Sequence, residues 1–336
     1  MILWGVGTVS AETIHLQSNQ IVQGDIVEGN DEYILVDVGL STPIRFYHDE
    51  IRSIETFGET HQERLSSSQD SFLWRVSTLH TTVYLMGSIH LGKPSMYPLD
   101  PDIELAFQVS DHLVVEVDID ALDPLQTQQK MLSLGMYADG DSLTDNITPQ
   151  TLRKLEKRME GYGLEPSYFT LFKPWFVALS LTVMQIKQLG FDENYGIDKY
   201  FLGKARDRMP ILEIESLDEQ LSLLAGLPDQ ELFLEFTLNT LDDTEKMLDV
   251  LLKAWQEGDA ATMGQIMISQ ALEKYPQTRP IYEKIFFERN RNMTQKIQEY
   301  LEKEGTYFVV VGAGHLVGEK GIVALLKKAG FEVEQL

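Results

Sequence analysis

The first part of the chain alternates hydrophobic and polar residues over short distances, as strands with one buried face do. Gly, Asn and Asp turns separate these runs, which cover residues 13–16, 21–27, 33–38, 44–47 and 51–54. Strands this short and closely spaced predict a small all-β barrel of SH3-like or Sm-like type over residues 12–58. Since no catalytic combination of residues occurs there, we expect an accessory or interaction module.

A second and larger domain is predicted over residues 72–336, after a polar linker at 59–71 that shows no period. Hydrophobic runs at 72–76 and 82–86 predict a hairpin at its start. Helical periodicity dominates afterwards, with helices predicted at 102–110, 149–161, 174–190, 217–225, 279–303 and 319–329. Further strands are predicted at 112–118, 211–215, 307–311 and 331–333. The expected fold class is therefore α/β (mixed α+β) with a large helical insert.

One pattern, Gly-x-x-His, follows two of the predicted strands. It runs from Gly87 to His90 and again from Gly312 to His315. Glycine permits a sharp turn off a strand and a close approach of the backbone to a bound ion or substrate. A lone histidine at a strand end is more often structural, but the repeated context favours a functional site. If the two strands are neighbours, both histidines reach one cleft, and we predict that His90 and His315 bind a metal ion.

Two histidines are an incomplete metal site, because catalytic sites usually add a carboxylate and leave a position for water. Glu116 and Glu215 each follow a predicted strand and are the first candidates for a ligand or a general base. Either could instead be an acid on the rim of the sheet. Asp118 and Glu213 are weaker alternatives.

Arg289 lies on the hydrophobic stripe of the last long helix, in step with Ile285 and Met293. A guanidinium does not lose its charge, so burial there requires an anionic partner, and a site carboxylate would serve. The alternative is an arginine that extends to the helix edge. We predict that Arg289 orients a carboxylate or stabilises developing negative charge.

Composition narrows the classes of function. The net charge is −24, which disfavours binding to nucleic acid or anionic lipid. With no cysteines, disulfides and thiol catalysis are excluded. Residues 2–9 are apolar, and Val9-Ser10-Ala11 resembles a cleavage site, so residues 1–11 are interpreted as a signal-peptide remnant and the protein as exported. A buried first strand is the alternative.

The segment from Gly312 to Gly318 also resembles a dinucleotide-binding loop with one residue too many. The chain printed here ends at Leu336, which leaves no room after that loop for the rest of a nucleotide-binding domain. This interpretation is therefore the weaker one.

The domain at about 70–336 resembles the TraB/GumN (TIKI-type) family. The resemblance lies in the two Gly-x-x-His segments and in Glu288-Arg289-Asn290 with Met293. It extends to Tyr97-Pro98-Leu99, Val115-Glu116-Val117-Asp118, Lys173-Pro174-Trp175, Gly196-Ile197-Asp198, Leu212-Glu213-Ile214-Glu215-Ser216 and Glu219-Gln220. It implies a fold related to erythromycin-esterase-like proteins and a metal-dependent hydrolase site containing His90, His315, Glu116 and Arg289, with Glu215 less firmly matched.

Two functions follow as hypotheses. The first is a hydrolase, and within that class a peptidase, in which His90, His315 and a carboxylate hold Mn²⁺, Co²⁺ or Zn²⁺. The second is a non-catalytic protein of the cell envelope that binds or sequesters a peptide or small ligand. Substrate, metal and oligomeric state stay open.

Overall fold

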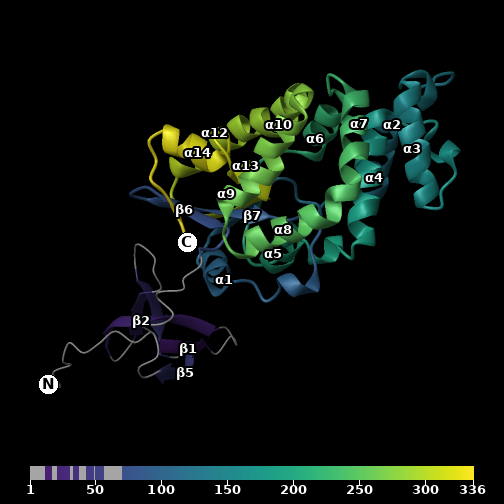
Figure 1. Ribbon diagram of the computed structural model, residues 1–336. Helices are drawn as coiled ribbons and strands as arrows, with labels where there is room; N and C mark the ends of the chain where they lie inside the picture. Colours follow the sequence, from purple (N-terminus) through teal and green to yellow (C-terminus); the bar gives the residue numbers. More distant parts are fainter. Residues whose placement is uncertain (1–11, 17–20, 31–32, 38–42, 49, 57–69) are drawn as a thin grey trace. The chain divides into compact units, whose positions relative to one another are not determined.

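The computed structural model describes residues 12–16, 21–30, 33–37, 43–48, 50–56 and 70–336 (Figure 1). The chain forms two compact units, residues 1–69 and 70–336. The predicted signal-peptide remnant at 1–11 and nearly all of the predicted linker at 59–71 lie outside the described residues.

The first unit contains an antiparallel sheet in the order β4-β3-β2-β1-β5. Buried Ile14, Val22, Ile34 and Val36 alternate with more exposed positions, as the sequence pattern requires. The strand predictions for this unit are confirmed, whereas the closed barrel stays a prediction. The strands are β1 (Glu12–Leu16), β2 (Ile21–Gly29), β3 (Tyr33–Asp37), β4 (Ile44–Tyr47) and β5 (Ile51–Thr56).

The second unit is a mixed α/β domain around a six-stranded sheet in the order β11-β6-β7-β10-β8-β9. Strands β7, β10, β8 and β9 are parallel, and β6 and β11 continue the sheet in antiparallel fashion. The strands are β6 (Leu73–Ser77), β7 (Thr81–Ser88), β8 (His112–Val115), β9 (Ile211–Glu213), β10 (Gly305–Gly312) and β11 (Val333–Gln335). Mixed α/β architecture with a large helical insert is therefore confirmed.

Strand β10 comes from the end of the chain and lies between β7 and β8. Its register with β7 is continuous, and Gly312 lies opposite Ser88 at its end. Both Gly-x-x-His segments therefore leave the sheet side by side at the carboxyl edge of parallel strands. Ligand sites in open α/β sheets form at this edge.

Helices cover both faces of the sheet (Figure 1). On one face Phe107 of α1 (Pro101–Gln108), Phe201 of α5 (Ile197–Ala205) and Phe308 of β10 pack with ring centroids 4.7–5.5 Å apart. On the other face Tyr300 of α12 (Arg289–Leu301) stacks on Tyr307 at 5.0 Å. Consecutive residues of β10 thus anchor opposite layers, and each buried ring contributes about 1.5–3 kcal/mol.

The helical insert extends between β8 and β10. Figure 1 shows α2, α3, α4 and α7 gathered at one end of the unit. Leu155 of α3, Val177 and Leu181 of α4 and Leu234 of α7 are buried together there. Proline at the first position and an N-cap side chain begin α2 and α3. The helices are α2 (Pro124–Gly135), α3 (Pro149–Gly161), α4 (Pro174–Gln188), α6 (Leu217–Ala225), α7 (Gln230–Thr240), α8 (Thr244–Gln256), α9 (Ala260–Gly264), α10 (Gln270–Lys274), α11 (Arg279–Tyr282), α13 (Ala313–Leu316) and α14 (Ile322–Lys328).

The last long helix differs from its prediction. The sequence predicts one continuous amphipathic helix over 279–303, whereas α11 and α12 are joined by a π-helical segment, Glu283–Glu288. A second π segment, Gln265–Ser269, lies between α9 and α10. A π turn inserts an extra residue without ending the helix, so a periodicity argument over the whole stretch misses it.

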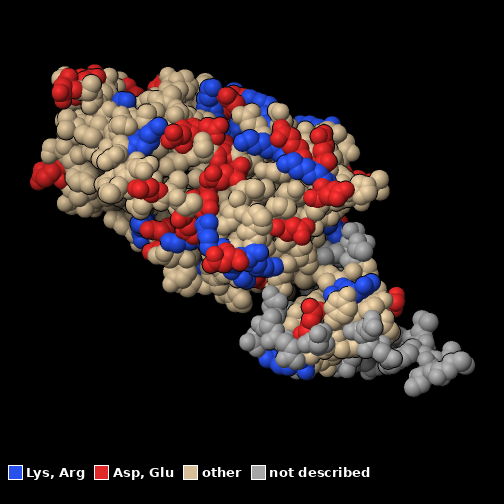
Figure 2. Space-filling view, turned by 180° about the vertical axis from the view of Figure 1, so that it is seen from behind, with Lys and Arg blue, Asp and Glu red and all other residues tan. Residues whose placement is uncertain are grey.

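Within the described ranges, no helix is both long and apolar enough to span a bilayer. On the face seen in Figure 2, acidic and basic side chains are interspersed over the larger unit. That face thus shows no broad patch of a single sign.

We predict that Gly87→Ala destabilises the fold by about 1–3 kcal/mol. A Cβ at Gly87 would lie 2.3 Å from the buried ring of Phe72 and 3.3 Å from the Cα of Ala313. Denaturant unfolding measures the change. In the control Gly203→Ala, nothing lies within 4 Å of the new Cβ. That helical position should gain up to about 1 kcal/mol. Equal stability of Gly87→Ala and the unmodified protein would contradict the packing described.

Candidate functional site

His90 and His315 lie at the edge where β7 and β10 end. His315, on the short helix α13, is buried with 6% of its side chain exposed, whereas 58% of the His90 side chain is exposed. The Phe286 ring packs against the imidazole of His315 at 5.3 Å between centroids. The structure therefore brings the two predicted histidines to the same edge of the sheet, with His315 buried and His90 largely exposed.

Each histidine has a partner at Nδ1. His90 Nδ1 lies 2.8 Å from Asp198 Oδ2, and Asp198 also accepts a hydrogen bond from Ser88 Oγ. His315 Nδ1 lies 2.6 Å from Asn290 Oδ1. The Asn290 amide nitrogen donates to the Lys320 carbonyl at 2.8 Å, which identifies Oδ1 as the atom facing the ring. Both Nδ1 atoms thus donate, and the Nε2 atom of neutral imidazole is left as the acceptor.

The site converges on the backbone of Gly312. A Cβ there would lie 3.3 Å from Glu116 Oε1, 3.4 Å from His315 Cδ2 and 3.5 Å from His90 Nε2. The Gly312 amide donates to Glu116 Oε1 at 2.7 Å, and His315 Nε2 is 3.9 Å from the same oxygen. Any side chain at this position would occupy the space that the three groups share.

Arg289 lies between two buried carboxylates. Its Nη2 donates to Glu116 Oε2 and to Glu215 Oε2, each at 2.6 Å, and its Nε donates to Glu215 Oε1 at 2.9 Å. Gln220 of α6 donates to both acids at 3.0 and 2.9 Å. The Glu215 amide also donates to the Glu116 carbonyl at 2.9 Å, so the β8–β9 ladder holds the two acids as neighbours. The anionic partner predicted for Arg289 is therefore this pair of glutamates.

Burial and charge shift the titration of three groups. Burial alone would raise the pKa of Glu116, but the positive charges of His315, His90 and Arg289 and the Gly312 amide lower it to about 2. Burial lowers the pKa of His315 to about 4, despite the attraction of Glu116. The Asp198 carboxylate raises the pKa of His90 to about 9. At neutral pH Glu116 is therefore ionised, His315 is neutral, and His90 carries a proton in the metal-free protein.

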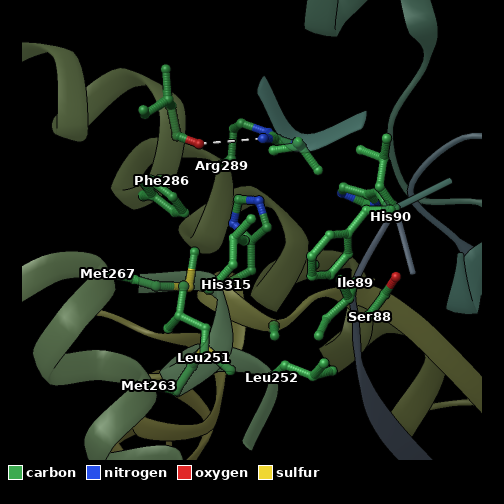
Figure 3. Close-up of a pocket in the computed structure, with 18 of the residues that line it drawn as sticks. Ser88, Ile89, His90, Leu251, Leu252, Met263, Met267, Phe286, Arg289 and His315 are labelled. Atoms are coloured by element: carbon green, nitrogen blue, oxygen red, sulfur yellow. Dashed lines mark hydrogen bonds between the residues drawn. The ribbon is translucent and has the colours of Figure 1, made fainter. Parts of the chain in front are cut away.

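A cavity of about 400 Å³ opens beside these groups. Figure 3 shows Leu251, Leu252 and Met263 on the opposite side of His315 from Arg289. The polar side chains lining the cavity are Ser88, His90, Arg289 and His315, and most of the other lining residues are apolar. The cavity therefore has one polar end, made by the site, and an otherwise apolar wall.

The weaker acidic candidates have structural partners elsewhere. Asp118 accepts two hydrogen bonds from Arg206, at 2.9 and 2.7 Å, and Glu213 accepts one from the Asp118 amide at 2.7 Å. These contacts hold together the loops behind the sheet edge, so both acids have partners outside the group formed by Glu116, Glu215 and Arg289.

The residues that sequence reasoning left without a role are Asp198, Asn290 and Gln220. All three stand within segments that resemble the family, but nothing in hydrophobic periodicity distinguishes a buried hydrogen-bond partner from a helix-surface residue. The sequence offered one signal, for Asn290, because it directly follows Arg289 and a polar residue next to a buried arginine is expected to have a fixed hydrogen-bond partner. The structure shows that Asn290 is fully buried.

The donor set suits a metal ion in part. Histidine ligands characteristically donate the other ring nitrogen to an oxygen acceptor, as both histidines do here. Over the described residues, however, no three His, Asp or Glu side chains are arranged to hold one ion. Glu116 is already bound by Gly312, Arg289 and Gln220. Two imidazole nitrogens are thus suitable ligands, and Glu116 as a third ligand stays a prediction.

Comparison with known proteins identifies the family. The model of the TraB/PrgY/gumN family matches residues 72–335. The chain belongs to this family. The resemblance predicted from the motifs is confirmed, and the first unit lies outside the match. No solved structure shows a significant match.

Individual proteins with similar sequences include bacterial and animal relatives. "Uncharacterized protein YbaP" of Escherichia coli (strain K12) is 29% identical over 255 residues, covering 73% of this chain and 87% of YbaP. "Metalloprotease TIKI1" of Xenopus tropicalis is 25% identical over 343 residues, covering 84% of this chain and 65% of that protein. The Homo sapiens protein of the same name is 25% identical over 328 residues, covering 80% and 62%. The chain thus spans less than two thirds of the length of these two metalloproteases.

Arg289→Met is predicted to cost about 3–5 kcal/mol of stability, because it leaves two buried carboxylates without their counter-charge. Arg291→Met is the matched control on the same helix, since the Arg291 side chain is 52% exposed and pairs with Glu283 at the surface. It should cost less than about 1 kcal/mol. Denaturant unfolding of both variants measures the difference, and similar losses would contradict the buried ion triad.

Asp198→Asn is predicted to lower the pKa of His90 from about 9 toward the ordinary value of 6.5. In the metal-free protein, the His90–Asp198 pair stabilises the fold fully below pH 6.5, and this contribution is lost as the pH rises through about 9. NMR titration of the ring signals after chelation measures the change. Glu193→Gln, at an exposed acid paired with Lys187, is the control and should leave the His90 titration unchanged. An unchanged His90 in Asp198→Asn would contradict the pairing.

Proposed function

We propose that this chain is a metal-dependent hydrolase, and specifically a peptidase, whose centre is formed by His90, His315 and Glu116. The observation that carries the proposal is the arrangement of the two imidazoles. Each donates from Nδ1 to an oxygen acceptor and turns its other edge toward the end of the cavity beside Gly312. The name metalloprotease, carried by the TIKI relatives, supports the reaction class.

A divalent ion held by the two Nε2 atoms would supply an activated water and polarise the scissile carbonyl. Glu116, ionised down to about pH 2, is suited to attract a cation and is a poor proton acceptor. Arg289 holds that carboxylate through one hydrogen bond from Nη2 at 2.6 Å, and two hydrogen bonds to Glu215, at 2.9 and 2.6 Å, hold Arg289 itself in place. Because Nε and Nη2 of Arg289 are bound to the two acids and Nη1 donates to the Ile285 carbonyl, its proposed role is to position Glu116 rather than to bind the substrate.

His90 and His315 have different proposed roles. Buried His315, with its neutral ring fixed by Asn290, would hold the ion without a change of protonation. His90 would have to lose a proton to serve as the second ligand, and its exposed position at the mouth of the cavity would let that proton reach solvent. Asp198 orients the ring in both protonation states.

Elemental analysis and peptide cleavage test the proposal together. Protein purified without chelator should contain a stoichiometric divalent metal, which His90→Ala with His315→Ala should remove. Cleavage in the double variant should fall by more than about a hundredfold, since even outer-shell substitutions cost 10–100-fold. His80→Ala, at an exposed turn, is the control and should change neither quantity.

Cleavage that survives both chelation and the double substitution would overturn the metal-dependent reaction. If the unmodified, metal-loaded protein binds peptides without turning them over, the protein is instead a sequestering module. Those two outcomes are separated by measuring binding and cleavage on the same peptides.

A further inference from the structure

We propose that the apolar cavity selects the substrate through a bulky apolar side chain next to the cleaved bond. This inference rests on the proposed peptidase function and names its substrate class. The composition of the cavity wall supports it. Leu248, Leu251 and Leu252 on α8 line it together with Met263, Met267 and Phe286.

The size of the cavity fits this occupant. Its volume is about 400 Å³. An apolar cavity of about 150 Å³ already accommodates benzene. An aromatic or long aliphatic side chain therefore fits with room to spare, whereas an alanine side chain leaves most of the wall without a contact. Because 58% of the His90 side chain is exposed at the mouth, a peptide main chain can approach the site from that side.

Charge disfavours ionised side chains in the cavity. The ionisable groups that line the cavity are His90, Arg289 and His315. A basic side chain would find no acid in the lining to pair with. An acidic side chain would find Arg289 already bound by Glu116 and Glu215. An apolar side chain is the class that the wall accommodates without leaving a buried charge unpaired.

Two features of the cavity wall predict that the substrate side chain is selected by its size more than by its shape. Methionine side chains fill irregular spaces, and Met263 and Met267 both face the cavity (Figure 3). Gly314 permits the close approach of Met267 and Phe286, because a Cβ there would lie 2.8 Å from Met267 Cε and 2.9 Å from Phe286 Cε1. Both contacts come from π-helical segments, Gln265–Ser269 and Glu283–Glu288, which are common at functional sites.

The test measures kcat/KM of the metal-loaded protein on peptides that differ only in the residue beside the cleaved bond: Ala, Val, Leu, Phe or Lys. The value should rise from Ala to Phe by at least about tenfold and be lowest for Lys. Equal values for Ala and Phe, or a preference for Lys, would overturn the inference while leaving the peptidase function intact. An octanoyl ester is run beside the series, and its turnover with a flat peptide series would assign the cavity to an acyl chain instead.

Leu252→Trp should reduce the Phe-to-Ala ratio by at least about tenfold, because the new ring occupies the cavity. Val250→Trp is the matched control on α8, at a side chain that is 44% exposed and absent from the lining, and it should keep the ratio. Leu251→Asp gives a second readout that does not depend on filling the cavity, because it places a carboxylate in the lining. It should raise the kcat/KM of the Lys peptide relative to that of the Phe peptide. An unchanged ratio in both lining variants, with folding checked by thermal melting, would overturn the inference.

Measurements of peptide binding distinguish a failure of this inference from a failure of the proposed peptidase function. If no peptide in the series is cleaved, calorimetry of the same peptides still reports selection. Tighter binding of the Phe peptide than of the Ala peptide, lost in Leu252→Trp but kept in Val250→Trp, would support the apolar pocket while the peptidase function fails. Equal binding of both peptides would overturn both.

Discussion

A guanidinium buried between two carboxylates holds this site together. Arg289 comes from the helix before β10, Glu116 from the end of β8 and Glu215 from the end of β9. Removing Arg289 would leave two largely buried carboxylates without a counter-charge, so this one side chain constrains the ends of both strands at once. The consequence for the site is that Glu116 keeps one oxygen directed at Gly312 and His315 while the other is bound to Arg289.

Much of this arrangement follows from local pattern. The strands at 82–86 and 307–311, the Gly-x-x-His that follows each of them, and the placement of Arg289 on a hydrophobic stripe are all visible in the sequence, because each is a matter of period and spacing. The parallel pairing of β7 with β10 is different. It joins the beginning and end of the domain, and local pattern alone does not choose which strands become neighbours. Only the repeat of the glycine–histidine context pointed to it.

The finer chemistry of the site could not be predicted in the same way. The partners of the two imidazoles, Asp198 and Asn290, come from elements far apart in the chain, and their roles depend on hydrogen-bond geometry. The π segment before Arg289 likewise escapes a 3.6-residue period, although it turns Phe286 toward His315. The asymmetry between an exposed His90 and a buried His315 is also invisible in two identical motifs. It arises because β7 leads into an open loop and β10 into a buried helix turn.

In the proposed centre, two imidazoles from equivalent strand ends share one ion. X-ray absorption spectroscopy of the zinc-loaded protein measures this directly. Two imidazole nitrogens are expected at about 2.0–2.1 Å from the metal, falling to one in His90→Ala. A first shell without imidazole, or one that is unchanged in His90→Ala and in His315→Ala, would contradict it.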